Sequence, residues 1–186
     1  MTSSDLTQFS YAVLVLVGRN GAGPHDLVRM ARQGRIFAAA AESQYYAEPK
    51  RLARLGYLEA RKEPGRTRER TVYRLTEKGL DALRDYARTP ASFTPLKSEP
   101  LLRLLIADLV GEAPTRESLR ALRDDLADLR GRIETSEESA ATLPHRAKYL
   151  RIVIEFLRRY LDLHEELIDA VERELASPST GMRSES

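Results

Sequence analysis

The spacing of apolar residues changes once along this chain of 186 residues, and the change limits the folds that it can adopt. Before residue 57 and after residue 76, apolar side chains recur every three or four positions, as they do in helices. Between these parts, Leu58 and Ala60 alternate with charged residues, and residues 71–75 also alternate, which is typical of β-strands. Pro64 and Gly65 favour a turn between the two segments. The sequence therefore predicts a mainly α protein with one small two-stranded hairpin.

Three short helices are expected before the hairpin and a fourth after it. Residues 9–17 are largely apolar and precede a glycine-rich turn at residues 18–23, which suits a buried helix rather than a strand. Pro24 fits the first turn of a second helix. The third helix should begin near Ser43, a residue type that caps helix starts, and close at Gly56, a residue type that follows helix ends.

Prolines at positions 90, 95 and 100 prevent the fourth helix from continuing, so we place a domain boundary there. Beyond this segment the sequence is helical in pattern, and its last residues are polar. The expected organisation is a first domain at residues 1–88, a proline-containing linker at residues 89–100, a helical domain at residues 101–176 and a disordered tail at residues 177–186.

The helical domain carries apolar stripes that favour assembly. Leucines from residue 119 onward follow spacings of three and four, which is the seam of a helix that packs along another helix. Residues 144–176 would form a helix of roughly 50 Å with a two-sided apolar stripe, able to cover its own subunit and a second one. We therefore predict a homodimer. The residues predicted for dimerisation are Leu119, Leu122, Leu126, Leu129, Val153, Leu157, Tyr160, Leu161, Leu167, Ile168 and Val171.

The net charge of +2 conceals an asymmetry between the two halves. Residues 1–88 hold 16 basic and 10 acidic side chains, whereas residues 89–186 hold 14 basic and 18 acidic ones. A basic module beside an acidic partner domain is typical of nucleic-acid-binding proteins. Random segregation of surface charge produces the same pattern, so the asymmetry indicates nucleic-acid binding only together with a suitable fold.

Three helices, a hairpin and a fourth helix follow the order of a winged helix-turn-helix domain. Its third helix fits the major groove of DNA, where Gln44 suits adenine and Lys50 suits guanine or phosphate. Arginines in the hairpin suit backbone phosphates, although a solvated loop has the same composition, and Tyr46 suits the core as well as DNA. The residues predicted to bind DNA are Ser43, Gln44, Tyr46, Ala47, Lys50, Arg51, Arg54 and the three wing arginines, Arg66, Arg68 and Arg70.

Two segments carry a resemblance to a known family. They are SQYYAEPKRLARLGYL at residues 43–58 and VYRLTEKG at residues 72–79. Residues 9–87 thereby resemble the N-terminal domain of PadR family transcriptional regulators, and the second half resembles that family's helical dimerisation domain. The matching residues are Tyr46, Lys50, Arg51, Leu52, Gly56, Tyr73, Leu75 and Thr76.

The resemblance implies a winged helix-turn-helix domain followed by a long-helix dimerisation domain. It also implies a repressor that binds an operator in double-stranded DNA and is relieved by a small-molecule effector or another signal. Pro49 departs from the family pattern, because it stands where a buried leucine is usual. A proline inside a helix cannot donate a backbone hydrogen bond, so the third helix should either kink or start late.

Several function classes find no support in the sequence. Without cysteine there are no thiolate nucleophiles, disulfides or cysteine metal sites, which suits the cytoplasm. The three histidines are scattered, and no acid-base cluster has a recognisable context, so we expect no metal, cofactor or enzymatic activity. We also expect no signal peptide and no membrane partner. The alternative function is a protein-protein interaction module that uses a winged-helix scaffold with a helical assembly arm.

Overall fold

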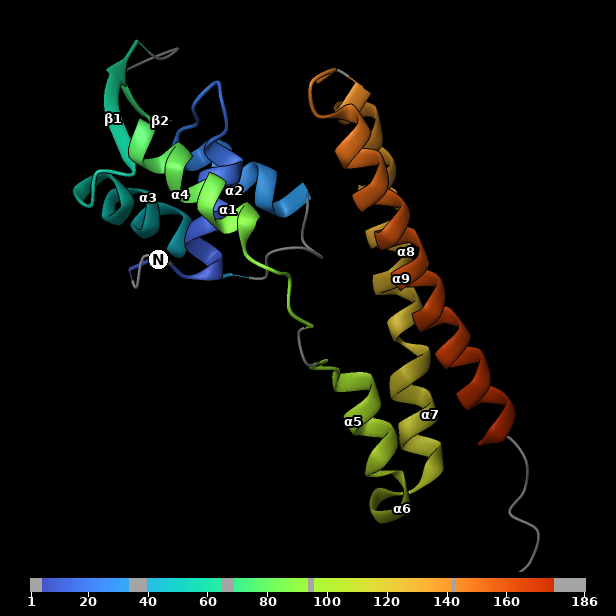
Figure 1. Cartoon of the computed structure of the whole chain (residues 1–186). Helices are drawn as coiled ribbons and strands as arrows, with labels where there is room; N and C mark the ends of the chain where they lie inside the picture. The colour runs from blue at the N-terminus through green and yellow to red at the C-terminus, as the bar shows by residue number, and fades with distance from the viewer. Residues whose placement is uncertain (1–4, 34–39, 65–68, 94–95, 142, 176–186) are drawn as a thin grey trace, which may run out of the picture. The chain divides into compact units, whose positions relative to one another are not determined.

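The computed structural model describes residues 5–33, 40–64, 69–93, 96–141 and 143–175 (Figure 1). The chain divides into two compact units, residues 1–93 and residues 94–186, each of which is described by itself. The division falls within the segment that the sequence predicts as a linker. The elements of the first unit are α1 (Gln8–Val17), α2 (Pro24–Gln33), α3 (Gln44–Arg54), β1 (Leu58–Glu63), β2 (Arg70–Leu75) and α4 (Glu77–Arg88).

The core of the first unit forms where its helices meet the base of the hairpin. The side chains of Leu14, Leu27 and Leu52, from α1, α2 and α3, are fully buried. Helix α1 is fixed at its start by Thr7, whose side chain accepts a hydrogen bond from the backbone N–H of Ser10 while the Ser10 hydroxyl accepts one from Thr7. This core holds α3 on one face and leaves its opposite face exposed.

The wing consists of β1 and β2, which pair antiparallel from Leu58 opposite Leu75 to Glu63 opposite Arg70. One residue from the glycine-rich turn, Ala22, pairs with Tyr73 as an isolated bridge, with backbone bonds of 3.0 and 2.9 Å. The neighbouring Gly21 has a φ of +78°, and a Cβ there would lie 2.8 Å from the Tyr73 carbonyl oxygen. Glycine is therefore required for the turn to approach β2.

The second unit is a helical hairpin with shorter helices before it. Its elements are α5 (Glu99–Leu105), α6 (Ala107–Val110), α7 (Glu112–Arg120), α8 (Leu122–Ala141) and α9 (Ala147–Glu174). The sequence is helical in pattern throughout residues 101–176, but the structure interrupts the first half of this segment at Ile106 and at Ala121. Helix α9 has 28 residues, or about 42 Å at 1.5 Å per residue.

Ion pairs join α7 and α8 to α9. In most of them an arginine of α7 or α8 meets a carboxylate of α9: Arg123 contacts Asp169 at 2.7 Å, and Arg130 contacts Asp162 at 2.6 Å. The charges are reversed in the pair between Glu137 of α8 and Arg158 of α9. These side chains are partly exposed, so each pair contributes at most about 1 kcal/mol. Together they favour the register in which α8 and α9 lie side by side. In the part of the chain that the structure describes, no helix is long and apolar enough to cross a membrane.

Candidate nucleic-acid interface

Helix α3 presents one exposed face to solvent. It runs without interruption from Gln44 to Arg54 and passes through Pro49, so the late start expected from that proline is not observed. Pro49 is fully buried, where it serves as an apolar core residue beside Tyr45 and Leu52. The last residue of the helix is Arg54, and its C-cap, Leu55, stands directly before Gly56, where the sequence predicts the end. The predicted DNA-binding residues that lie exposed on this helix or at its start are Ser43, Gln44, Ala47, Lys50 and Arg54.

Ser43 differs from its sequence-based description as a helix cap, whereas the placement of Tyr46 agrees with the expectation that it suits the core as well as a surface role. Ser43 precedes the helix in a helical conformation and makes no side-chain capping bond. The Tyr46 ring is half-buried, and its hydroxyl shares a 3.0 Å hydrogen bond with Nδ1 of His25 in the first turn of α2. Tyr46 thus joins the two helices of the helix-turn-helix. Its partner His25 lies next to α3 as well, although the sequence-based prediction of DNA-binding residues omits it.

Arg51 is only partly exposed, because side chains of α3 and α1 hold its guanidinium. Its guanidinium donates to both carboxylate oxygens of Glu48, at 2.8 and 2.7 Å, and to the Ser10 hydroxyl at 3.1 Å. Burial alone would raise the pKa of Glu48, but hydrogen bonds from Arg51 and Ser10 and the charge of Arg51 outweigh it and lower that pKa. The hydrogen bond to Glu48 likewise raises the pKa of Arg51.

The C-terminal end of α3 is anchored by residues that precede and begin α4. Lys78 donates a 2.7 Å hydrogen bond to the Leu55 carbonyl, and its ammonium lies 4.4 Å from the centre of the Tyr57 ring. A cation at a helix C-terminus is favourable because the last carbonyls carry partial negative charge. The Thr76 hydroxyl reaches the carbonyls of Gly56 and Tyr57 at 2.7 and 3.1 Å.

The wing carries basic side chains next to acidic ones. Arg70 is half-exposed and lies 3.5 Å from Asp26 of α2 and 3.9 Å from Glu63. The other two wing arginines, Arg66 and Arg68, lie outside the described residues. Lys62 on β1 is exposed and is a further cationic candidate. The prediction of DNA-binding residues omits it because an exposed strand lysine has no distinctive pattern.

The predicted dimerisation residues are mostly buried within one chain. Leu119, Leu126, Leu161, Ile168 and Val171 are buried between α7, α8 and α9. The predicted positions that are only partly covered are Leu122, Leu129, Leu157, Tyr160 and Leu167, while Val153 is exposed. The leucine seam therefore finds its partner helix in its own chain.

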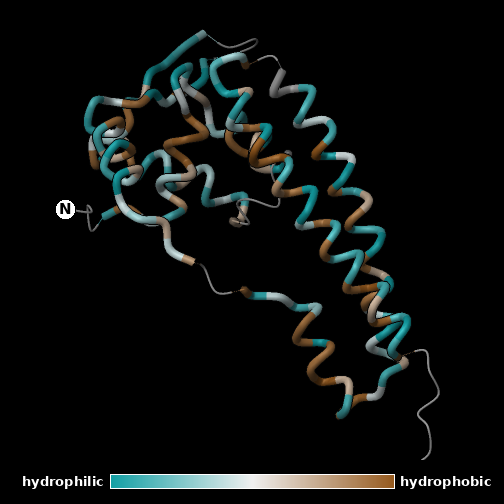
Figure 2. The backbone as a smooth tube through the Cα atoms, turned by 45° about the vertical axis from the view of Figure 1, so that its right-hand side comes forward, coloured by the Kyte–Doolittle hydropathy of each residue, from teal (hydrophilic) through white to brown (hydrophobic). Residues whose placement is uncertain are grey.

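Other apolar side chains of the second unit remain exposed. Helices α5 and α6 are largely apolar, as Figure 2 shows, and Leu105 in α5 is 77% exposed. On α9, Phe156 is 66% exposed. The exposed apolar residues of α9, which we call the α9 stripe, are Tyr149, Ile152, Val153, Phe156 and Leu163.

Among the described residues, no three His, Asp or Glu side chains are grouped as a metal site requires.

No protein-family model and no curated protein sequence matches the chain. Solved structures do match it. PadR of Bacillus subtilis in complex with operator DNA is 21% identical, with a TM-score of 0.63 over 89% of this chain and 99% of that one. The chain has the PadR fold.

Two further structures extend this likeness. A PadR-like transcriptional regulator of Bacillus cereus is 14% identical, with a TM-score of 0.70 over 95% of this chain and 98% of that one. A Streptococcus mutans protein is 16% identical, with a TM-score of 0.75 over 92% and 100%. The Bacillus subtilis protein is also solved in complex with p-coumaric acid. The PadR fold confirms the predicted fold class: a mainly α chain with a two-stranded wing, a winged helix-turn-helix unit and a helical second half.

Proposed function

We propose that this protein is a sequence-specific DNA-binding transcriptional regulator of the PadR family that acts as a homodimeric repressor. The observation that carries this proposal is the exposed face of α3 within a winged-helix unit that has the PadR fold. Gln44, Lys50 and Arg54 project from this face, and a helix of this kind fits the major groove. The solved complex of Bacillus subtilis PadR with operator DNA supports DNA binding by a chain of this fold.

The phosphate contacts would come from the wing. Positive charge near the backbone releases counterions from DNA, which is the main source of affinity that does not depend on sequence. The excess of basic side chains in residues 1–88 supports this role. Arg70 would have to exchange its contacts with Asp26 and Glu63 for a phosphate, and the other two wing arginines would add to this contact.

A second copy of the chain is the partner that best suits the exposed apolar residues of the second unit. The α9 stripe recurs at helical spacing, and α5 and α6 add Leu102, Leu105, Leu109 and Val110. Exposed apolar surface of this kind is unfavourable in water and marks an interaction site. A two-fold dimer would present two recognition helices to two half-sites of one operator. Of the predicted dimerisation residues, Val153 would make direct contact, and the buried ones would support α9 from within.

Relief of repression by a small molecule is the regulatory part of the proposal. The Bacillus subtilis PadR structure with p-coumaric acid supports an effector of this general kind, an aromatic carboxylic acid or another small molecule.

The test of DNA binding begins with full-length protein and a library of random-sequence duplexes. We expect repeated selection to enrich one duplex with two related half-sites, and we expect the logarithm of its binding constant to fall linearly with the logarithm of salt concentration. The alternative, a protein-protein interaction module, predicts no enriched sequence and little dependence on salt. Failure to enrich any duplex would therefore contradict the proposal.

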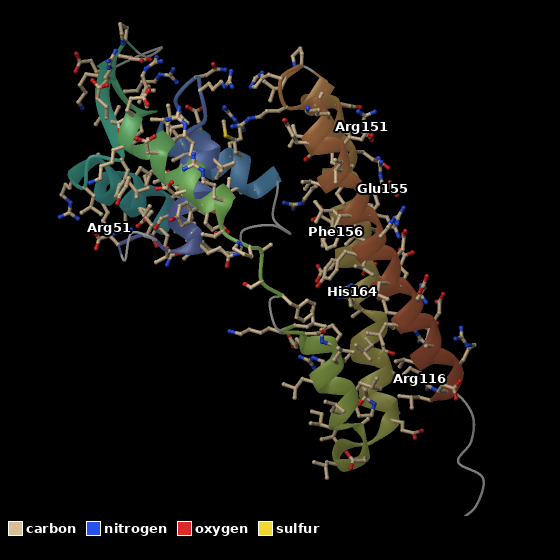
Figure 3. The ribbon with its side chains drawn as sticks, viewed as in Figure 1. Arg51, Arg116, Arg151, Glu155, Phe156 and His164 are labelled. Carbon is tan, nitrogen blue, oxygen red and sulfur yellow. The ribbon has the colours of Figure 1, made fainter. Side chains whose placement is uncertain are left out.

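The test of the dimer uses sedimentation of the full-length chain at micromolar concentration. Phe156→Glu should convert a dimer to a monomer because it places a charge in the apolar contact. Arg151→Glu is the matched control, since five residues separate it from Phe156 and place it about 140° away around α9 (both are labelled in Figure 3). A wild-type chain that sediments as a monomer would contradict the homodimer.

A further inference from the structure

We propose that Arg51 positions the recognition helix rather than contacting DNA, and that its partners in this role are Glu48 and Ser10. This inference rests on the proposed DNA-binding function. Figure 3 labels Arg51 on α3, the helix whose exposed face carries that function. Its guanidinium is directed at Glu48, one turn earlier on α3, and at Ser10 on α1.

The three side chains form a closed set of hydrogen bonds. Ser10 is fully buried, and its hydroxyl donates to Glu48 at 2.7 Å while it accepts from Arg51 at 3.1 Å and from the backbone N–H of Thr7 at 2.9 Å. The Thr7 hydroxyl oxygen also lies 3.0 Å from it. A serine hydroxyl has one donor and two acceptor positions, so the bonds to Glu48, Arg51 and the Thr7 N–H already fill them. The same hydroxyl thus completes the capping box of α1 and binds α3.

The charge of Arg51 is balanced within the protein. The Glu48 side chain is only 13% exposed and that of Arg51 is 34% exposed, so the carboxylate is largely removed from water. A carboxylate in this position would repel the phosphates of bound DNA unless a cation compensates it. Arg51 supplies that cation through two parallel bonds, a geometry that suits arginine. The pair therefore contributes no net charge to DNA binding.

The contacts also fix the rotation of α3 about its own axis. Glu48 and Arg51 lie on the side of α3 that faces α1, and their bonds to Ser10 span 38 and 41 residues of sequence. Successive residues of a helix differ by about 100° in direction, so a small rotation of α3 would change which side chains face the bases. By contrast, within the described residues Lys50 and Arg54 are exposed and make no ion pair. They are the α3 cations that remain available to DNA.

The experiment uses the full-length protein and the duplex that the wild type selects from a random library, with an unrelated duplex as the second ligand. The double variant Glu48→Gln, Arg51→Gln keeps the net charge, and Arg54→Gln is the matched control for a phosphate contact. We expect the double variant to keep the salt slope of the wild type and to lose preference for the selected duplex. We expect Arg54→Gln to make the slope shallower by about one.

Ser10→Ala is the milder variant, and it changes no charge. Because it removes the bonds of the Ser10 hydroxyl to both Glu48 and Arg51, it should reduce affinity for the selected duplex by at least about three- to tenfold, the effect of a single lost hydrogen bond, and leave affinity for the unrelated duplex unchanged. A merely stabilising bond would move neither affinity of the folded protein. The proposal is overturned if the double variant loses about one unit of slope, as Arg54→Gln does, or if Ser10→Ala keeps full preference. If the wild type selects no duplex, the proposed function fails and this inference fails with it.

Discussion

Gly79 is a position where the structure allows no side chain, although it lies in the first turn of α4, where alanine is normally preferred. A Cβ at residue 79 would lie 2.3 Å from the carbonyl oxygen of Tyr57 and 3.3 Å from Cδ2 of Leu75. The closer neighbour is backbone, and its carbonyl also accepts hydrogen bonds from the backbone N–H and hydroxyl of Thr76. The Gly79→Ala variant can therefore form only if α4 moves by about 1 Å away from the residues that follow α3.

The size of the effect follows from two opposing terms. Alanine gains about 1 kcal/mol over glycine in a helix, whereas forcing a methyl group into a packed contact costs about 1–3 kcal/mol and occasionally more. Because the closer neighbour is a backbone oxygen at 2.3 Å, the cost should be in its upper part, about 2–3 kcal/mol, so we expect Gly79→Ala to lower the free energy of unfolding by about 1–2 kcal/mol. Gly131 in α8 is the matched control, because a Cβ there meets nothing within 4 Å. Gly131→Ala should gain about 0.5–1 kcal/mol.

The measurement is urea unfolding of the full-length variants followed by far-UV circular dichroism, with calorimetry to assign each change to one unit. Gly79→Ala should lower the transition of the first unit, and Gly131→Ala should raise that of the second. A Gly79→Ala variant as stable as the wild type, with normal DNA binding, would refute the claim that this contact fixes the junction of α3 and α4.

Three further predictions concern DNA binding and pH. Replacing the three wing arginines by Ala should weaken binding to all duplexes and make the salt slope shallower by up to about one unit per lost contact; an unchanged slope would show that they do not touch phosphate. Gln44→Ala should lower affinity for the selected duplex by about 1–3 kcal/mol and spare the unrelated duplex; equal loss for both would exclude base reading. Because the folded pKa of Glu48 is lowered, its contribution to stability is complete above the unfolded value of about 4.3 and is lost as pH falls through the folded pKa. The stability difference between wild type and Glu48→Gln, measured by urea unfolding, should therefore shrink in acid, and a difference independent of pH would contradict this.

Local patterns predicted the elements of the first unit because each was encoded by nearby residues. The start of α3 near Ser43, its end before Gly56 and the two strands all follow from spacing and turn residues. The contacts of Arg51 could not be predicted, because Ser10 lies 41 residues earlier and nothing in the sequence indicates which acid a surface arginine will meet. The bridge between Ala22 and Tyr73 could not be predicted either, because a single paired residue has no alternating pattern.

In the second unit, spacing showed which face of a helix is buried but not what covers it. Leu119 and Leu126 have the spacing of a helix-helix seam, and that spacing is the same whether the partner helix belongs to the same chain or to another. The structure covers both residues with α9. Phe156 and Leu105 have the same helical spacing as core residues, so the spacing does not distinguish them from the core. In the structure they are exposed.

Under the proposed function, the contacts at both ends of α3 would determine how the free energy of DNA binding is distributed. Arg51 and Tyr46 hold the helix to α1 and α2, and Lys78 holds its last turn, so its backbone needs no further ordering on the DNA. The remaining ordering cost lies in long exposed side chains such as Gln44 and Lys50, at about 0.5–1.5 kcal/mol each. One bidentate base contact favours the correct base over a wrong one by about 1–3 kcal/mol. In most cases this exceeds the cost of ordering the side chain that makes the contact. A recognition helix with few base-reading side chains can therefore be selective, provided that its backbone is already fixed.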